Sequence, residues 1–227
     1  ARPGRPRLGD MCSRYGLDAT VEDLAGVFEI DLVGDDVPAP APESRPTDRV
    51  AVVLESEKTP GRRLEAARWD LARPGQRELR GPRGPLINVR AETLASKFGW
   101  AVQRRRCLIP ATGYWEWTGP KGARQPYVIR PSVGEVLAFA GVYSWWRDPG
   151  RDEDDPSKWV LTAALLTMDA VERLAPIHDR NPVPLPADAW DDWLDPTTPG
   201  TEALVVAAVS EGRGVAATLD FAPVDRG

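Results

Sequence analysis

Short apolar runs separated by clusters of Gly, Pro and Asp dominate the chain from residue 49 onward. Runs of this length with turn residues between them are typical of strands in an antiparallel sheet or barrel. The Asp-rich segment 148–158 is expected to be an exposed hairpin loop. The pattern predicts strands at 49–56, within 105–117, and at 126–131, 136–146, 159–168, 203–209 and 216–224.

Helical periodicity interrupts these runs. Val21, Leu24, Val27 and Phe28 share one face after the capping segment 18–20, so a first helix is expected there. Because the helices flank a β core, the predicted fold class is α+β, a mainly antiparallel, barrel-like sheet with a few peripheral helices. Two further helices are predicted at 91–99 and 186–195, and a Pro-rich loop at 34–48.

The length of 227 residues and a hydrophobic content of 42% are enough for the core of one sizeable domain. We expect a single domain over residues 12–227, because residues 1–11 lack apolar periodicity and are typical of a disordered leader or a wrongly assigned start. Two cysteines are too few for a disulfide framework and fit a reducing cytosol. No apolar run has the roughly 20 residues of a membrane span. A cytoplasmic protein without membrane contact is expected.

The charge is unevenly distributed along the chain. The formal net charge is −5, yet the segment 61–106 holds twelve Lys and Arg against four acids, a local charge of +8. Eleven of these twelve cations are Arg, whose guanidinium binds phosphate bidentately and stacks on bases. The segment therefore indicates either a nucleic-acid surface or an ordinary solvated basic face.

His178 is the only histidine and lies among prolines in "LAPIHDRNPVPLP". A single histidine is commonly a packed or surface residue, but the prolines exclude a regular helix and favour a rigid loop, where catalytic side chains are often displayed. Glu116 lies in "GYWEWTG", where alternation puts it on the same face as Tyr114. If that face is buried, the pKa of Glu116 rises and suits a general acid, and if not, Glu116 lies in water at a sheet edge.

Asn88 and Arg90 precede the predicted second helix in "NVRAET", which indicates an anion site at the helix start or an ordinary turn and cap. Trp69 lies beside arginines, and its ring either stacks on the bases of a single strand or packs in the core. Cys107 lies in an apolar run and is predicted to be buried, whereas Cys12 follows Met11 among polar residues.

Five segments stand in a recognisable order: "MCSRYGL" (11–17), "NVRAET" (88–93), "RRCLIPATGYWEW" (105–117), "LAFAGVYSWW" (137–146) and "IHDRNPVPL" (177–185). In this order and spacing they resemble the SOS response-associated peptidase (SRAP) family, whose members process abasic sites in DNA. The resemblance runs from Met11 to about Leu185. It implies a role in the DNA damage response, on single-stranded DNA that contains abasic sites, by a monomer without cofactor or metal, associated with the nucleoid in a bacterium.

The resemblance also implies a chemistry. Removal of Met11 and the preceding residues, a self-processing peptidase step, would make Cys12 the N-terminal residue. Its α-amine, with a pKa of about 7.7–8.0, would then form a Schiff base with the aldehyde of the ring-opened abasic site. The thiol would close onto the imine carbon and form a thiazolidine, a covalent DNA–protein crosslink. An internal cysteine offers only an amide nitrogen, which is not a nucleophile.

By position, the resemblance assigns four catalytic residues: Cys12, Asn88, Glu116 and His178. Glu116 would move protons, Asn88 would orient the amine or the sugar, and His178 would assist linkage, its reversal or β-elimination of the DNA strand. Arg14 and Arg90 match DNA-contacting arginines of the family, and the basic segment adds three expected DNA-binding residues: Trp69, Arg73 and Arg105.

Several positions depart from the family pattern, two of them within the five segments named above. Ser13 stands where Gly usually follows the Cys, and Asn181 stands where Met usually precedes the Pro of the histidine motif. Two other functions remain open: a cysteine peptidase that uses Cys12 and His178 with Asn88 or Glu116, and a non-catalytic module that binds single-stranded DNA. The first needs no free amine, and the second predicts salt-sensitive binding without a covalent product.

Overall fold

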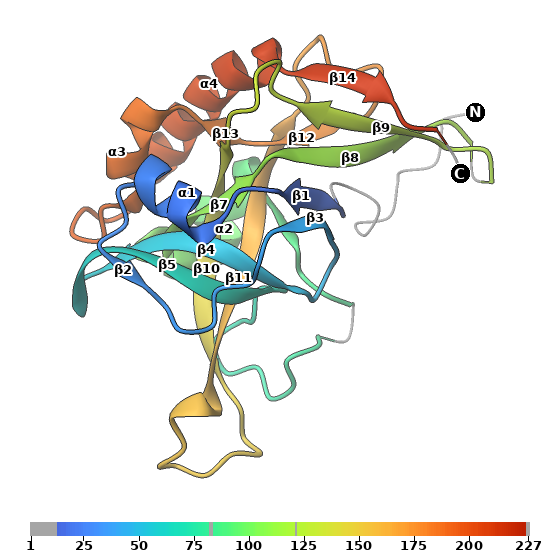
Figure 1. Cartoon of the computed structure of the whole chain (residues 1–227). Helices are drawn as coiled ribbons and strands as arrows, with labels where there is room; N and C mark the ends of the chain where they lie inside the picture. Colours follow the sequence, from blue (N-terminus) through green and yellow to red (C-terminus); the bar gives the residue numbers. More distant parts are fainter. Residues whose placement is uncertain (1–12, 82–83, 121, 226–227) are drawn as a thin grey trace.

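The structure is a computed structural model that describes residues 13–81, 84–120 and 122–225. Five strands close into a barrel at its centre (Figure 1). Neighbouring strands pair antiparallel except β5 and β11, whose parallel pairing closes the ring. In their order around the barrel the strands are β4 (Arg49–Ser56), β5 (Thr59–Trp69), β11 (Trp159–Asp169), β10 (Leu137–Arg147) and β7 (Arg106–Ala111).

Four short strands extend the barrel at its edges. β6 and β12 flank the last residues of β11 on opposite sides, so that Arg90 faces Thr167 and Arg180 faces Asp169. The other two strands pair with β5 and β10. The four are β2 (Leu32–Val33), β6 (Asn88–Arg90), β12 (Arg180–Pro182) and β13 (Pro184–Leu185).

A second, five-stranded sheet packs beside the barrel. Strand β7 of the barrel leads directly into strand β8 of this sheet, with only Thr112 between them. Tyr114 of this sheet packs edge-on against Phe139 of the barrel at a centroid distance of 5.8 Å. In order, its strands are β14 (Asp220–Pro223), β9 (Gln125–Arg130), β8 (Gly113–Thr118), β1 (Tyr15–Leu17) and β3 (Ala41–Ser44).

The helices lie outside the strands, and two begin at side-chain caps. The Thr20 hydroxyl accepts a bond from the Asp23 amide at 3.1 Å, and the Asp23 carboxylate accepts one from the Thr20 amide at 3.0 Å, a reciprocal capping box. The helices are α1 (Val21–Val27), α2 (Ala91–Val102), α3 (Trp190–Leu194) and α4 (Glu202–Thr218), with 3₁₀ turns at Pro156–Lys158 and Ala187–Ala189. No helix within the described residues is both long and apolar enough to cross a membrane.

Arg106 at the start of β7 ties two helices to the barrel. Its guanidinium is 1% exposed and donates to backbone carbonyls at the end of α2, including that of Val102 at 2.7 Å. It also donates to the carbonyl of Trp193 in α3 at 2.5 Å and to that of Thr198 at 3.0 Å. Burial lowers the pKa of Arg106, yet these carbonyls solvate the cation in place of water.

Most of the predicted elements are confirmed. The strand predicted at 49–56 is β4 with the same bounds, and the segment 105–117 divides into β7 and β8. The predicted helices correspond to α1, α2 and α3, and the loop 148–158 joins β10 to β11. Within the first helix the shared face holds for Leu24 and Phe28, which are buried, but Val27 is 44% exposed. The mainly antiparallel, barrel-like fold class is therefore confirmed.

Three predictions need correction. Residues 203–209 form part of α4 instead of a strand, because the apolar run continues with helical spacing: Val205, Ala208, Gly212 and Ala216 are the buried positions. Helix α4 also includes residues 216–218, which were predicted as the beginning of the strand 216–224, so that β14 begins only at Asp220. The long strand β5 was missed because charged residues break its alternation, and the Pro-rich loop contains the short strand β3.

Candidate functional site

Glu116 is a buried acid in the second sheet. It lies in β8, is 1% exposed, and shares its buried face with Tyr114, which is also 1% exposed. The neighbouring Trp115 and Trp117 face the other side and are half-buried. The inward orientation that alternation left open is therefore confirmed.

The first described residues lie directly beside Glu116. The Arg14 carbonyl accepts a bond from the Trp115 amide at 3.0 Å, and Tyr15 faces Tyr114 in the antiparallel pair β1–β8. Arg14 also lies over the Trp117 ring, with 5.0 Å from its guanidinium carbon to the ring centroid, and pairs with Glu43 at 3.3 Å. The predicted nucleophile Cys12 lies outside the described residues.

Trp69 connects this strand to Asn88. Its indole N–H donates to the Ile87 carbonyl at 3.0 Å, and its ring packs edge-on against Tyr15 at a centroid distance of 4.9 Å. Asn88 follows directly as the first residue of β6, and its side chain is half-buried. The prediction that Trp69 stacks on DNA bases is wrong, since the side chain is 0% exposed. Its aromatic surface is used to pack β1 against the barrel.

His178 lies in the loop between β11 and β12, with 14% of its side chain exposed. Its Nδ1 lies 3.0 Å from the Arg180 amide, 3.2 Å from the Arg180 carbonyl and 3.1 Å from the Asp179 carboxylate. The amide suits an unprotonated Nδ1, and the two oxygens suit an Nδ1 that carries a proton. The loop therefore fixes the ring through Nδ1 in either protonation state.

Arg180 joins this loop to the start of α2. Its side chain is 6% exposed and binds Glu92 through two bonds of 2.7 and 2.9 Å. It also donates to the Thr167 carbonyl at 2.7 Å and to Asp169 at 2.5 Å. Burial disfavours the charged guanidinium, but the bonds to Glu92 and Asp169 outweigh this cost and raise the pKa of Arg180. Sequence reasoning missed Arg180 as a site residue, although its position beside His178 was a usable signal.

Asn181, which stands where the family usually has Met, has a structural role in this protein. It is 1% exposed, its side-chain oxygen accepts a bond from the Val171 amide at 3.1 Å, and its amide donates to the Pro182 carbonyl at 2.6 Å. The polar side chain therefore fixes the same loop that carries His178.

The predicted DNA-binding arginines are spread more widely. Arg90 is exposed at the junction of β6 and α2. It pairs with Thr167 of β11, and Arg180 pairs with Asp169 on the other side of the same strand. Arg73 is exposed and lies over the Phe98 ring of α2 at 5.5 Å. Arg105 precedes β7, whose six residues put it about 20 Å from the end that leads to Glu116. Arg14 and Arg90 are the two that lie next to the candidate catalytic residues.

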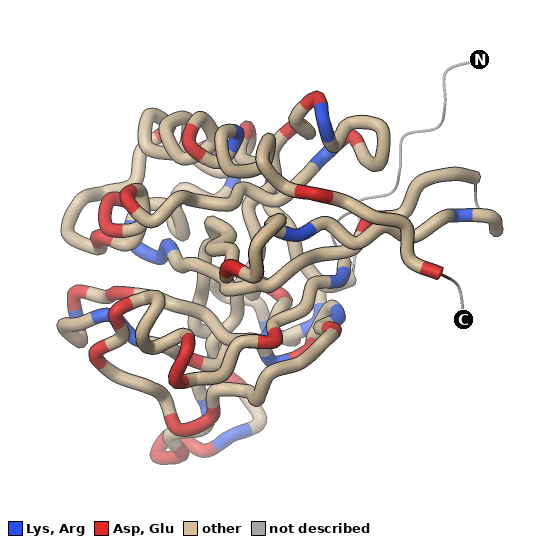
Figure 2. The backbone as a smooth tube through the Cα atoms, turned by 45° about the horizontal axis from the view of Figure 1, so that its top comes forward, with Lys and Arg blue, Asp and Glu red and all other residues tan. Residues whose placement is uncertain are grey.

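The basic segment 61–106 does not form one cationic face. Arg62 donates to Glu55 at 2.9 Å and to Asp191, Arg68 donates to the Thr47 carbonyl, and Arg106 is buried. Lys and Arg positions alternate in space with Asp and Glu positions over most of the chain (Figure 2). Part of the local charge of +8 is thus used within the fold. The exposed cations among the described residues of the segment are Arg73, Arg77, Arg80, Arg90, Lys97 and Arg104, of which Arg104 pairs with Glu57.

The residues at the site lie in two linked groups. Tyr15 and Glu116 belong to the paired strands β1 and β8, and Arg14 directly precedes β1. Arg90, Arg180 and His178 surround the last residues of β11. Asn88 lies between the groups, joined to the first through Trp69 and to the second along β6. Among the described residues no group of three or more His, Cys, Asp or Glu side chains is arranged to hold a metal ion.

Comparison with known proteins shows the family of this chain. The family model described as SOS response associated peptidase (SRAP) matches residues 11–226. The chain belongs to the SRAP family. The match begins at Met11, directly before Cys12, so the first ten residues lie outside the SRAP domain.

Curated relatives match between about half and most of the chain. Abasic site processing protein YoqW of Bacillus subtilis is 31% identical over 192 residues, which cover 82% of this chain and 81% of that protein. Abasic site processing protein YedK of Escherichia coli is 29% identical over 202 residues, which cover 87% and 86% of the two chains. Abasic site processing protein HMCES of Gallus gallus is 30% identical over 130 residues, 48% of this chain and 37% of that protein.

Solved structures show the same SRAP fold. A protein from Bacteroides thetaiotaomicron superposes with a TM-score of 0.73 at 19% identity, covering 95% of this chain and 93% of that chain. A phage-related protein from Bordetella bronchiseptica superposes with a TM-score of 0.68 at 26% identity, covering 95% of each chain. The barrel and its accompanying sheet are therefore shared at low sequence identity.

Proposed function

We propose that this SRAP protein processes abasic sites by forming a covalent crosslink between Cys12 and single-stranded DNA. The observation that carries the proposal is the position of Glu116, a 1% exposed acid on the strand that pairs with the residues following Cys12. A buried acid on the strand that pairs with the first strand of the domain has a clear use if the N-terminal amine reacts with an aldehyde. The family membership and the names of the relatives support the same reaction.

The reaction needs no cofactor. The neutral Cys12 amine adds to the aldehyde carbon of the ring-opened abasic site, and loss of one water gives an imine. The thiol then adds across the C=N bond, with sulfur bonding to carbon and the proton ending on nitrogen, which gives the thiazolidine. Glu116 supplies and recovers the protons in these steps. The amine is released only when the bond between Met11 and Cys12 is cleaved, and self-processing by the same site is part of the proposal.

Asn88 and His178 act on the sugar in this proposal. Asn88 lies between the two residue groups, where its amide can orient the amine or the sugar hydroxyls. His178 in its protonated form donates a proton to the opened sugar, and in its neutral form it removes a proton in β-elimination. Half-buried Arg14 and exposed Arg90 bind phosphates on either side of the lesion, with Arg73 and Arg105 adding more distant contacts.

The proposal is tested with two forms of the protein, one beginning at Cys12 and one that keeps residues 1–11 and carries Met11→Leu to slow processing. Each is mixed with a single-stranded oligonucleotide bearing one abasic site, and intact mass spectrometry follows the product. We expect a denaturant-resistant adduct only with the Cys12 form, with a mass equal to protein plus DNA minus one water. Cys12→Ala should abolish it, and a matched duplex should react more slowly.

Other outcomes separate the alternatives. A Cys12 form that gives no adduct contradicts the crosslinking function. Equal turnover of a protein substrate with and without residues 1–11 favours the cysteine peptidase, because that reaction needs no free amine. Salt-sensitive binding without a covalent product favours the DNA-binding module.

A further inference from the structure

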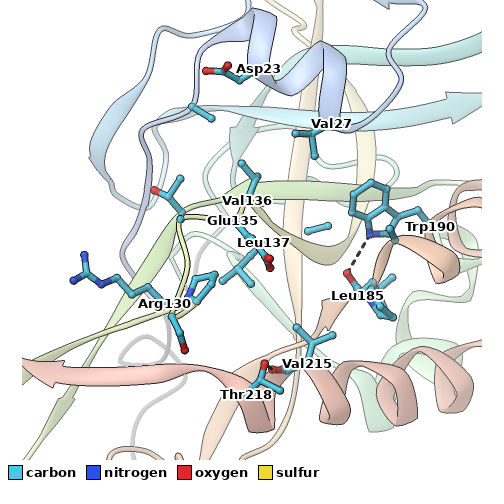
Figure 3. A pocket seen from close by; sticks show the side chains of 18 of the residues that line it. Asp23, Val27, Arg130, Glu135, Val136, Leu137, Leu185, Trp190, Val215 and Thr218 are labelled. Carbon is cyan, nitrogen blue, oxygen red and sulfur yellow. Dashed lines mark hydrogen bonds between the residues drawn. The ribbon is translucent and has the colours of Figure 1, made fainter.

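A large cleft lies beside the second sheet, apart from the candidate site. Its volume is about 1220 Å³, and α1, α4, the β9–β10 loop and the segment after β13 line it. The side chains of Val27, Leu185, Trp190 and Val215 surround its interior (Figure 3). Trp190 is fixed there by its indole N–H, which donates to the Leu185 carbonyl at 3.1 Å, and by stacking on Phe28 at 4.6 Å. The apolar wall is thus already ordered.

Charged side chains of one predominant sign lie around this wall. Asp18, Asp23 and Glu135 line the cleft against a single cation, Arg130, which gives the lining residues a net charge of −2. The Thr20 hydroxyl and amide bind the Asp23 carboxylate and lower its pKa, so this charge persists at neutral pH. Asp18 and Glu135 are exposed. The cleft therefore repels a polyanion such as DNA and attracts a cationic ligand.

The cleft is separate from the candidate site. It begins at Asp18 and Thr112, where the Asp18 amide donates to the Thr112 hydroxyl at 3.2 Å. The candidate site begins at Arg14, four residues earlier on the same extended strand, or about 13 Å away. None of Asn88, Glu116, Arg90 and His178 lines the cleft. An occupant of the cleft leaves the candidate site accessible.

We propose that this cleft docks a segment of a partner protein that presents apolar side chains flanked by Lys or Arg. Its volume exceeds the roughly 300–1,000 Å³ of small-molecule pockets and suits a peptide. Apolar anchors would contact Trp190, Val215 and Val27, and the flanking cations would face Asp18 and Glu135. This is the mode in which a groove binds an amphipathic segment. The proposal is independent of the crosslinking chemistry.

Selection from a displayed library of random twelve-residue peptides tests the proposal. The library is first depleted on the full chain carrying Gly214→Trp and then selected on the unmodified full chain. Gly214 lines the cleft, and a Cβ added there meets no heavy atom within 4 Å, so the backbone position admits a side chain and Trp is chosen to fill the cleft. We expect enrichment of peptides with at least two apolar residues next to Lys or Arg.

Affinities of the enriched peptides are then measured by fluorescence anisotropy. Gly214→Trp and the double variant Asp18→Lys with Glu135→Lys should each weaken binding at least about tenfold, whereas Arg130→Glu should strengthen it. Matched controls are Val206→Trp, at a 62% exposed position of α4 outside the cleft, and Asp152→Lys in the β10–β11 loop. Both should bind as the unmodified chain does. If Gly214→Trp unfolds, the depletion step uses the double charge variant.

Three results overturn the proposal: no peptide whose enrichment depends on the cleft, enrichment of acidic or uncharged peptides, or affinities that do not respond to the charge variants. Each of these results counts only for a variant whose thermal unfolding and circular dichroism match those of the unmodified chain. Crosslinking to an abasic oligonucleotide, measured in parallel, should be unchanged by Gly214→Trp, so failure of the cleft proposal and failure of the crosslinking proposal are distinguishable.

Discussion

Arg106 and Arg180 are both buried, but their surroundings differ. Arg106 donates to backbone carbonyls of α2, α3 and the following loop, none of which carries a formal charge. Arg180 binds the carboxylates of Glu92 and Asp169, whose side chains are 49% and 72% exposed. At one end of the barrel, the buried Arg106 therefore holds helices to the barrel without a charged partner, and we call this contact the closed joint. At the other end, Arg180 and its partly exposed carboxylates hold together the elements that carry Asn88 and His178, and we call this contact the charged joint.

Cys107, next to Arg106, gives the largest expected effect. It is 0% exposed, and burial strongly raises the pKa of its thiol, so at pH 8 it stays in the unreactive thiol form. In a Cys12→Ser variant, where Cys107 is the only cysteine, labelling with a thiol reagent should be at least about a thousandfold slower than in urea. Fast labelling of the folded protein would show that this end of the barrel opens to solvent. The two ends of the barrel would then not differ as the surroundings of Arg106 and Arg180 indicate.

Arg106→Met should strongly destabilise the closed joint. It leaves buried carbonyls of Val102 and Trp193 without a donor, at a cost of about 3 kcal/mol, or roughly 150-fold in the unfolding equilibrium. Urea unfolding measures the change. Arg173→Met, at a half-exposed arginine paired with Asp220, is the control and should change the free energy of unfolding by less than about 1 kcal/mol.

Glu116→Gln should lower the crosslinking rate roughly 100-fold, because the amide keeps the shape of the side chain but cannot transfer protons. Single-turnover crosslinking by the form beginning at Cys12 measures the rate, and urea unfolding shows that the fold is intact. Glu172→Gln at an exposed acid is the matched control. A rate within twofold of the unmodified protein would remove Glu116 from the chemistry and leave its burial as a feature of packing.

Arg180→Lys is expected to have the smallest effect and to separate positioning from stability. Lysine keeps the charge but loses the two-pronged contact with Glu92, so the loop that holds His178 should become less fixed. The crosslinking rate should fall about tenfold and its pH profile should change, with a loss of less than about 1 kcal/mol in the free energy of unfolding.

Glu92→Gln tests the same contact from the other side. Its effect on the crosslinking rate should match that of Arg180→Lys, and the double variant should be no slower than either single one, because both break one interaction. Additive effects, or an unchanged pH profile, would mean that Arg180 is a structural joint like Arg106.

Much of the fold follows from local pattern. The helix start after the capping segment 18–20 and the strand 49–56 depend on neighbours within a few residues, and both are confirmed. Alternation put Glu116 on the same face as Tyr114, but only the structure shows that this face is buried. The run 203–209 was misassigned because a short apolar run fits a buried strand as well as a helix. The choice between them came from the helical spacing of the residues that follow it.

The sequence by itself determined the family, the positions of Asn88, Glu116 and His178 in their motifs, and the excess of arginine between 61 and 106. Only the tertiary structure decided which arginines remain exposed, that Trp69 packs against Tyr15, and that Glu92 binds Arg180 across 88 residues. The physical reason is that burial and ion pairing depend on which distant segments the barrel brings into contact, and local residue patterns carry no record of those partners.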